Sequence, residues 1–133
     1  MKWVFIEVPS DDKSGKKVSA RIMNSLSPYS LQQNRLFDIK LSVEEAVRNA
    51  VVHGNKSNPR LFVRVNYKIE SDQVKIEVED EGAGFDPASI PDPTNNKEAM
   101  LKESGRGVWL IKKLMDKVDF NVKGNKIKMV KFF

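Results

Sequence analysis

Three short segments of the sequence carry residues whose types and spacing suit phosphate chemistry. Glu45 and Asn49 stand four residues apart, Asp80 begins the run Asp-Glu-Gly-Ala-Gly, and Gly105 and Gly107 flank one arginine before an apolar stretch. Together they would supply a carboxylate and an amide on one helix face, a fixed acid at a strand end, and a helix start opened by glycine. Each segment is common by itself, so the prediction of a nucleotide-phosphate site rests on all three occurring in this order.

The first segment combines a base with a metal ligand. Side chains four residues apart project from the same face of a helix. The amide oxygen of Asn49 is a neutral ligand suited to Mg²⁺, which keeps several waters when it bridges nucleotide phosphates. The carboxylate of Glu45, one turn earlier, can orient or deprotonate a nucleophile at the γ-phosphate. The alternative is a solvated polar helix face, which is the commoner explanation for an isolated Glu/Asn pair.

The second and third segments bring backbone close to a ligand. Asp80 stands where an apolar strand runs into Gly82 and Gly84, and glycine lets the chain approach a ligand closely. A carboxylate there can accept the exocyclic amine of adenine, although Asp-Glu-Gly also forms ordinary loop turns. Gly105 and Gly107 open a helix whose free amides and positive dipole end suit phosphate, although Gly-x-Gly before a helix is common.

Apolar periodicity predicts the elements that position these residues. A strand over residues 3–8 is followed by a helix whose apolar positions recur at helical spacing over residues 18–26. A second helix with one apolar stripe runs from about Phe37 to Gly54, and a glycine there is typical of a helix end. The polar face of this helix carries the first segment.

The second half of the chain predicts two hairpins, a loop and one helix. Alternating apolar residues over 61–67 and 74–78 form a β-hairpin that leads straight into the second segment. The stretch from Pro87 to Ser104 holds three prolines and paired asparagines, which predicts a mobile loop that acts as a lid. A helix over residues 108–115 follows, and strand residues that include Val122 flank a closing hairpin turn.

Composition restricts the class of protein. The chain has 133 residues, and we expect a single domain over residues 1–133. It contains no cysteine, which excludes disulfides and thiolate chemistry and fits a reducing compartment. No window approaches the roughly 20 apolar residues of a membrane span, and the apolar N-terminal stretch is too short for a signal sequence. We therefore expect a soluble, cytoplasmic protein without membrane contact.

The net charge is positive, but the basic residues are spread along the sequence. The formal net charge is +5 and the isoelectric point is about 9.4. Such an excess favours an acidic partner or polyanionic ligand, yet lysines scattered over solvated faces give the same total. The scattered arrangement is favoured because no long basic block occurs, and direct nucleic-acid binding is not expected.

Taken together, the three segments resemble the N, G1 and G2 boxes of the GHKL ATP-binding superfamily. The similarity is greatest to its small bacterial branch, the anti-sigma-factor serine kinases, which share the pattern Glu-Ala-x-x-Asn-Ala-x-x-His-Gly, here residues 45–54. They also share Leu-Met-Asp, here residues 114–116, soon after the Gly-x-Gly helix. The resemblance implies the Bergerat fold, an α/β two-layer (α+β) sandwich in which a mixed, mostly antiparallel sheet has helices packed on one face.

The same resemblance implies roles for individual residues. Glu45 would be the general base, Asn49 would bind Mg²⁺ and with it the nucleotide, and Asp80 would read adenine. Gly82 and Gly84 would shape the adenine pocket. The nucleotide would also contact the residues that begin the last helix: Gly105, Arg106, Gly107 and Val108. Of these, the two glycines would bring backbone amides to the phosphates.

Five residues depart from the family pattern or have two interpretations. The G2 box reads Gly-Arg-Gly-Val, whereas the family usually has a smaller or aliphatic middle residue and Leu or Met last. Arg106 can reach a phosphate or point to solvent, and solvent is favoured. For His53, a position at the helix C-terminus is favoured over contact with the triphosphate. Trp109 is assigned to the core rather than to the pocket rim, and Arg48, off the catalytic face, is a candidate for partner contact.

The resemblance implies an ATP- and Mg²⁺-dependent protein serine kinase that is also an anti-sigma factor. It would bind a sigma factor and phosphorylate a serine on an anti-anti-sigma antagonist of the STAS type, with ATP and ADP as its nucleotides. The competing function is a non-catalytic interaction module, in which nucleotide orders the lid and so controls partner binding. Glu45 separates the two, since a binding module needs no base. Whether the protein forms a homodimer is left open.

Overall fold

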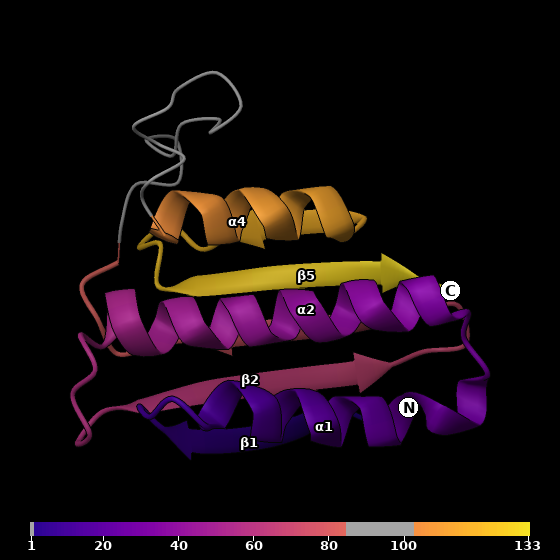
Figure 1. Cartoon of the computed structure of the whole chain (residues 1–133), viewed down its shortest axis with the longest axis horizontal. Coiled ribbons are helices and arrows are strands. Elements are labelled where there is room, and N and C mark those ends of the chain that lie inside the picture. Colours follow the sequence, from indigo (N-terminus) through magenta and orange to yellow (C-terminus); the bar gives the residue numbers. More distant parts are fainter. Residues whose placement is uncertain (1, 85–102) are drawn as a thin grey trace.

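A five-stranded sheet forms one layer of the structure (Figure 1). The computed structural model describes residues 2–84 and 103–133, with only the backbone of residues 103–105. In these residues the strand order is β1-β2-β3-β5-β4, and all four pairings are antiparallel. The strands are β1 (Val4–Pro9), β2 (Phe62–Ile69), β3 (Gln73–Glu79), β4 (Lys117–Phe120) and β5 (Lys126–Phe132).

The α-helices form the second layer, on one face of the sheet (Figure 1). They are α1 (Ser14–Leu26), α2 (Gln33–Asn49) and α4 (Glu103–Leu114). A 3₁₀ turn, η1 (Ser27–Tyr29), follows α1, and a π-helical turn, η2 (Ala50–Gly54), extends α2. α2 lies between the other two helices and packs against both. The predicted α/β two-layer sandwich is therefore confirmed, and the described strands contain no parallel pair.

Alternation along the strands explains how the sheet meets the helices. Every second residue of β2 and β3 is buried: Val63, Val65, Tyr67, Val74, Ile76 and Val78. The helices complete the core with buried side chains at helical spacing: Val18, Ile22, Leu26, Ile39, Val43 and Val47. Each such aliphatic side chain contributes about 1.5–3 kcal/mol by leaving water, which makes this layer contact the main source of stability.

The element boundaries differ from the prediction at several places. α1 begins at Ser14 instead of near residue 18, and α4 begins at Glu103 instead of residue 108, so Gly105 and Gly107 lie within the helix. α2 begins at Gln33, whereas the sequence predicts a start near Phe37. The first turn of α2 is mainly polar and so lacks the apolar period on which the prediction depends. Val122, expected on a strand of the closing hairpin, is fully exposed and lies in the turn after β4. The predicted lid lies outside the described residues, except for its last two positions, which begin α4.

A buried lysine joins the end of α4 to α2. Lys131 of β5 is 7% exposed, and its ammonium donates to the carbonyl oxygen of Leu114 (2.5 Å) and to Oδ2 of Asp38 (3.1 Å). Leu114 is the last residue of α4, and Asp38 belongs to the first half of α2. A cation suits a helix C-terminus, where the last carbonyl groups lack helical partners. The contact therefore fixes the C-terminal end of α4 against α2.

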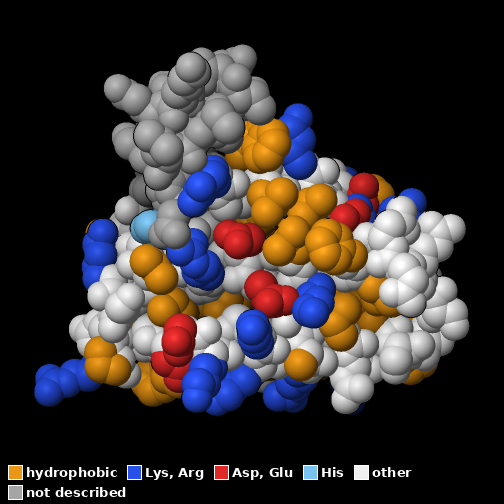
Figure 2. Space-filling view, in the orientation of Figure 1, with side chains coloured by type: hydrophobic (Ala, Val, Ile, Leu, Met, Phe, Trp, Pro, Cys, Tyr) orange, Lys and Arg blue, Asp and Glu red, His pale blue; other side chains and the backbone are white. Residues whose placement is uncertain are grey.

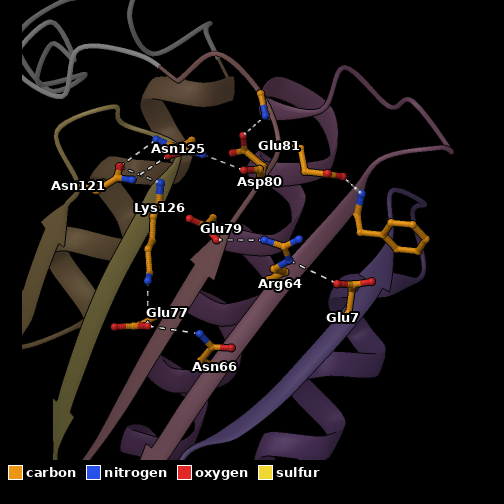
Figure 3. A network of polar contacts seen from close by, with 12 residues as sticks. Glu7, Arg64, Asn66, Glu77, Glu79, Asp80, Glu81, Asn121, Asn125 and Lys126 are labelled. Atoms are coloured by element: carbon orange, nitrogen blue, oxygen red, sulfur yellow. Dashed lines mark hydrogen bonds and ion pairs between the residues drawn. The ribbon is translucent and has the colours of Figure 1, made fainter.

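The exposed surfaces carry charges of both signs and several large apolar side chains, among them Phe5 and Phe37. On the sheet face opposite the helices, Arg64 pairs with Glu7 and Glu79, and Lys126 pairs with Glu77 (Figure 3). Basic and acidic side chains are interspersed over the helical face (Figure 2), in agreement with the scattered arrangement expected from the sequence. None of the described helices combines the length and the apolar character that crossing a membrane requires.

Candidate functional site

Asp80 directly follows β3 and is fixed by the turn between β4 and β5 (Figure 3). Its backbone N–H donates to the carbonyl oxygen of Asn125 (3.0 Å), and the side-chain amide of Asn125 donates to the carbonyl oxygen of Asp80 (2.9 Å). The backbone N–H of Gly82 donates to Oδ1 of Asp80 (2.8 Å). The predicted place of this acid at a strand end is confirmed, and both its backbone and its carboxylate are held in position.

The electrostatic setting of Asp80 differs from that of a surface aspartate. Burial raises the pKa of its carboxyl group above the ordinary value, and the neighbouring charge of Glu79 acts in the same direction. The N–H of Gly82 and the ammonium of Lys123 lower this pKa, but the effect of burial is larger. A half-buried carboxylate with a raised pKa beside a glycine-rich turn is typical of a binding site.

Two glycines let the end of α2 approach the Asp80 turn. A Cβ atom on Gly54 would lie 2.2 Å from the carboxylate carbon of Asp80, and one on Gly82 would lie 2.1 Å from the carbonyl oxygen of Gly54. Both distances are far below van der Waals contact, so a larger residue at either position would push the two segments apart. Gly54 ends the π-helical turn η2, and such turns are frequent at functional sites. The sequence indicates Gly54 as a helix end and as the last residue of the family pattern, but not as a contact of Asp80.

Gly84 is required by backbone conformation as well as by space. Its φ of +83° lies in the left-handed region, and a Cβ atom there would lie 1.9 Å from the carbonyl oxygen of Lys123. Lys123 belongs to the turn between β4 and β5, which also holds Asp80. The segment Asp80–Gly84 and this turn therefore form one continuous surface.

The first and third segments meet where α2 packs against α4. A Cβ atom on Gly107 would lie 2.8 Å from Nδ2 of Asn49 and 3.0 Å from Oε2 of Glu45. Glycine in a helix costs about 1 kcal/mol relative to alanine, so its presence here serves this close approach. The predicted pair on α2 thus faces the N-terminal half of α4. The sequence left open that Glu45 and Asn49 belong to a solvated polar face, whereas in the structure both side chains lie against α4.

The side-chain oxygen of Asn49 fits a metal ligand. Oδ1 of Asn49 is buried and has no hydrogen-bond partner among the residues that the structure describes. A buried carbonyl oxygen without a partner costs about 1–3 kcal/mol, which a ligand at this position would remove. A neutral oxygen donor suits Mg²⁺, which is commonly held by one or two protein groups together with phosphates and water.

The remaining predicted residues lie on or beside α4 and the end of α2. Gly105 lies in the first turn of α4, Arg106 is exposed, and Val108 is buried. The exposure of Arg106 agrees with the expected solvent orientation. Trp109 is half-buried, with the Lys113 ammonium 5.7 Å from its ring centroid, so its ring is shared between the core and the helix surface. His53 and Arg48 are both half-buried.

Three asparagines near Asp80 have no counterpart in the sequence prediction. Asn55 follows Gly54, and Asn121 and Asn125 belong to the turn between β4 and β5. Asparagine is ordinary in turns, so neither composition nor spacing distinguishes these residues. Their contacts exist only because the fold brings the end of α2 and the last hairpin to the same end of β3.

Comparisons with known proteins identify the family of the chain. Residues 8–131 match the family model described as the histidine kinase-like ATPase domain. The chain is 28% identical over 120 residues to the anti-sigma F factor of Oceanobacillus iheyensis, covering 90% of this chain and 80% of that protein. It is 35% identical over 137 aligned residues to the serine-protein kinase RsbW of Staphylococcus aureus, covering 96% of this chain and 86% of that protein.

A solved structure shares the fold. The crystal structure of the RsbU and RsbW domains of Rv1364c from Mycobacterium tuberculosis matches with a TM-score of 0.63 at 15% identity, covering 99% of this chain and 32% of that chain. The family model spans nearly the whole sequence, and it agrees with the resemblance inferred from the three segments. The chain belongs to the histidine kinase-like ATPase domain family, in the GHKL superfamily.

Proposed function

We propose that this chain is an ATP-dependent protein serine kinase of the GHKL type that also acts as an anti-sigma factor. The relative from S. aureus is named a serine-protein kinase, and the relative from O. iheyensis is named an anti-sigma F factor. The observation that carries the proposal is the contact of α2 and α4 at Gly107, which brings Glu45 and Asn49 beside the start of α4.

In this function ATP or ADP lies between the Asp80 turn and α4. The carboxylate of Asp80 accepts the exocyclic amine of adenine, and Gly82 and Gly84 shape the pocket around the base. The phosphates lie near the start of α4, where the helix dipole is positive and where the backbone N–H groups of residues 103–106 lack helical acceptors. The residues proposed to contact the nucleotide there are Gly105, Arg106, Gly107 and Val108.

Asn49 is the residue proposed to hold Mg²⁺. Its buried amide oxygen has no other partner in the described chain, and phosphate oxygens and water would complete the coordination. When bound, the ion neutralises charge on the β- and γ-phosphates.

Glu45 is the proposed general base. Its carboxylate takes the proton of the acceptor serine hydroxyl as the serine oxygen attacks the γ-phosphorus. The bond between the γ-phosphorus and the β–γ bridging oxygen breaks, and ADP leaves. Because Glu45 lies beside Gly107, the base and the start of α4 are close enough to act on one phosphate.

The proposal extends to partners and location. The sigma factor is one partner, and an anti-anti-sigma protein with a STAS domain carries the acceptor serine. Residues 1–133 act as one ATP-binding domain in the cytoplasm, without direct contact to nucleic acid or membrane. The mixed surface charge in Figure 2 supports protein partners over a polyanion.

The test is transfer of radiolabelled γ-phosphate from ATP to STAS-domain proteins of the source organism. Wild type should label one of them on serine, and Glu45→Gln should not, while both bind Mg²⁺-ADP equally in calorimetry. Glu44→Gln is the matched control because Glu44 lies on the same helix but contacts Ser19 of α1. If no STAS protein is labelled while nucleotide still changes partner affinity, the kinase function is wrong and the nucleotide-gated switch replaces it.

A further inference from the structure

The backbone of the Asp80 turn is held from two sides by asparagines of different elements. On one side is Asn55, which is 1% exposed. Its Oδ1 accepts the backbone N–H of Glu81 (2.8 Å). Its Nδ2 donates to Oγ of Ser10 (2.9 Å) and to the carbonyl oxygen of Phe62 (3.0 Å). All the hydrogen-bonding atoms of this amide are used, and they tie the Asp80 turn to the ends of β1 and β2.

On the other side is Asn125, in the turn between β4 and β5 (Figure 3). It exchanges two hydrogen bonds with the backbone of Asp80, one through its own carbonyl oxygen and one through its side-chain Nδ2. Its Oδ1 in turn accepts from Nδ2 of Asn121 (2.7 Å). Oδ1 of Asn121 accepts the backbone N–H groups of Gly124, Asn125 and Lys126, which fixes the turn itself.

This arrangement compensates for the glycines of the same segment. Gly82 and Gly84 let the chain approach a ligand closely, but they also give the turn more conformations to lose on folding. A carboxylate that must meet one amine of a base needs a fixed backbone beneath it. The contacts of Asn55 and Asn125 lie on the residues immediately around the Asp80 side chain, so they restrict the direction in which that side chain points.

We propose that Asn55 and Asn125 are positioning residues that hold Asp80 in its adenine-binding orientation before nucleotide arrives. This inference rests on the proposed nucleotide function. Asparagine is required at position 55 because it both accepts the N–H of Glu81 and donates to two oxygens, which neither aspartate nor leucine does. At position 125 an aspartate would replace the Nδ2 donor with a carboxylate oxygen, which cannot donate to the carbonyl oxygen of Asp80.

The first experiment measures Mg²⁺-ADP affinity by calorimetry for Asn55→Ala and Asn125→Ala. Each should bind about 5- to 20-fold more weakly than wild type, which corresponds to the loss of one or two hydrogen bonds that orient the carboxylate. Asn66→Ala is the matched control, since Asn66 is an asparagine of β2 whose amide contacts Glu77 instead of the turn. Its affinity should equal that of wild type. Wild-type affinity in both folded variants would overturn the inference.

A double-mutant cycle separates positioning from general stability. In an Asp80→Asn background, Asn55→Ala should weaken binding much less than it does alone, because the charged acceptor it orients is gone. An equal loss in both backgrounds would show that Asn55 supports the fold alone and would overturn the inference. If Asn55→Ala does not fold, the same cycle is run with Asn125→Ala, whose backbone hydrogen bond to Asp80 remains.

Hydrogen exchange of the Glu81 amide decides the question without nucleotide. We expect slow exchange in wild type and faster exchange in Asn55→Ala, with core amides of β3 unchanged. Equal exchange in the two proteins would overturn the inference. If wild type does not bind Mg²⁺-ADP at all, the proposed function fails, whereas the exchange result still tells whether Asn55 orders the turn.

Discussion

Gly107→Ala tests whether the close contact of α2 and α4 serves catalysis. The new methyl group would lie 2.8 Å from Nδ2 of Asn49, 3.1 Å from its Oδ1 and 3.0 Å from Oε2 of Glu45. The shortest of these distances is about 0.6 Å below an ordinary contact of 3.4 Å, so α4 or both polar side chains must shift by that amount. Displacements approaching 1 Å at reacting groups lower rates by up to about 10²-fold.

The effect on stability is the sum of two opposing contributions. Alanine gains about 1 kcal/mol over glycine inside a helix, and overpacking costs about 1–3 kcal/mol. The net loss is about 0–2 kcal/mol, so we expect a melting temperature between that of wild type and several degrees lower, together with phosphoryl transfer slower by about 10- to 100-fold. The assay is radiolabel transfer to the STAS substrate, run beside thermal unfolding followed by circular dichroism.

A glycine in another helix provides the control. In Gly15→Ala the added Cβ lies 3.5 Å from the carbonyl oxygen of Glu44, an ordinary contact, so α1 should become slightly more stable and transfer should not change. If folded Gly107→Ala transfers phosphate at the wild-type rate, the contact between α4 and the pair on α2 has no catalytic role. That result would remove the main support for the assignment of Glu45.

Three further predictions concern the acids and the amide of the site. Asp80→Asn should weaken Mg²⁺-ADP binding by about 10- to 100-fold in calorimetry, because adenine loses a charged acceptor worth about 1.5–3 kcal/mol, and unchanged affinity would reject the adenine assignment. Burial raises the pKa of Asp80 in the folded state above 3.8, so the folded protein holds this proton more tightly than the unfolded chain does. Ionisation of Asp80 therefore lowers the free energy of unfolding, and this loss of stability develops as the pH rises through the folded-state pKa. Nucleotide-free Asp80→Asn should therefore melt at or above the wild-type temperature at pH 7, with the difference shrinking as the pH falls toward 3.8; a lower melting temperature at pH 7 would contradict the pKa direction. Glu45→Ala should keep nucleotide affinity and lose about 10²- to 10⁴-fold in phosphoryl transfer, whereas Asn49→Ala should lose both, and removal of Mg²⁺ by a chelator should weaken binding in wild type but hardly further in Asn49→Ala.

Local periodicity was sufficient to predict most of the fold. The alternation over 61–67 and 74–78 predicts β2 and β3 because one face of each strand is buried and the other is solvated. The spacing of apolar residues predicts α1 for the same reason. The polar first turn of α2 could not be predicted in this way, because its residues contribute little to the core.

The chemistry of the site was only partly visible in the sequence. Glu45, Asn49 and Asp80 stood out because their spacing and glycine neighbours resemble known motifs. Asn55 and Asn125 did not, since each acts through a hydrogen bond to backbone that is distant in sequence. Long-range contacts of turn residues do not change the periodicity or the composition of the sequence. They could therefore be identified only from the structure.

The contacts of Lys131 hold one end of α4 in place, so any tilt of this helix would be largest at its other end. Lys131 anchors the C-terminal end through Leu114, and in the other half of the helix Gly107, without a side chain, lies close to Glu45 and Asn49. Gly107 precedes the anchored Leu114 by about 10 Å along the helix axis, so a tilt of about 5° around the anchored end would move it by about 0.9 Å. A small tilt about the end held by Lys131 would therefore change the distance between α4 and the acid and amide of α2.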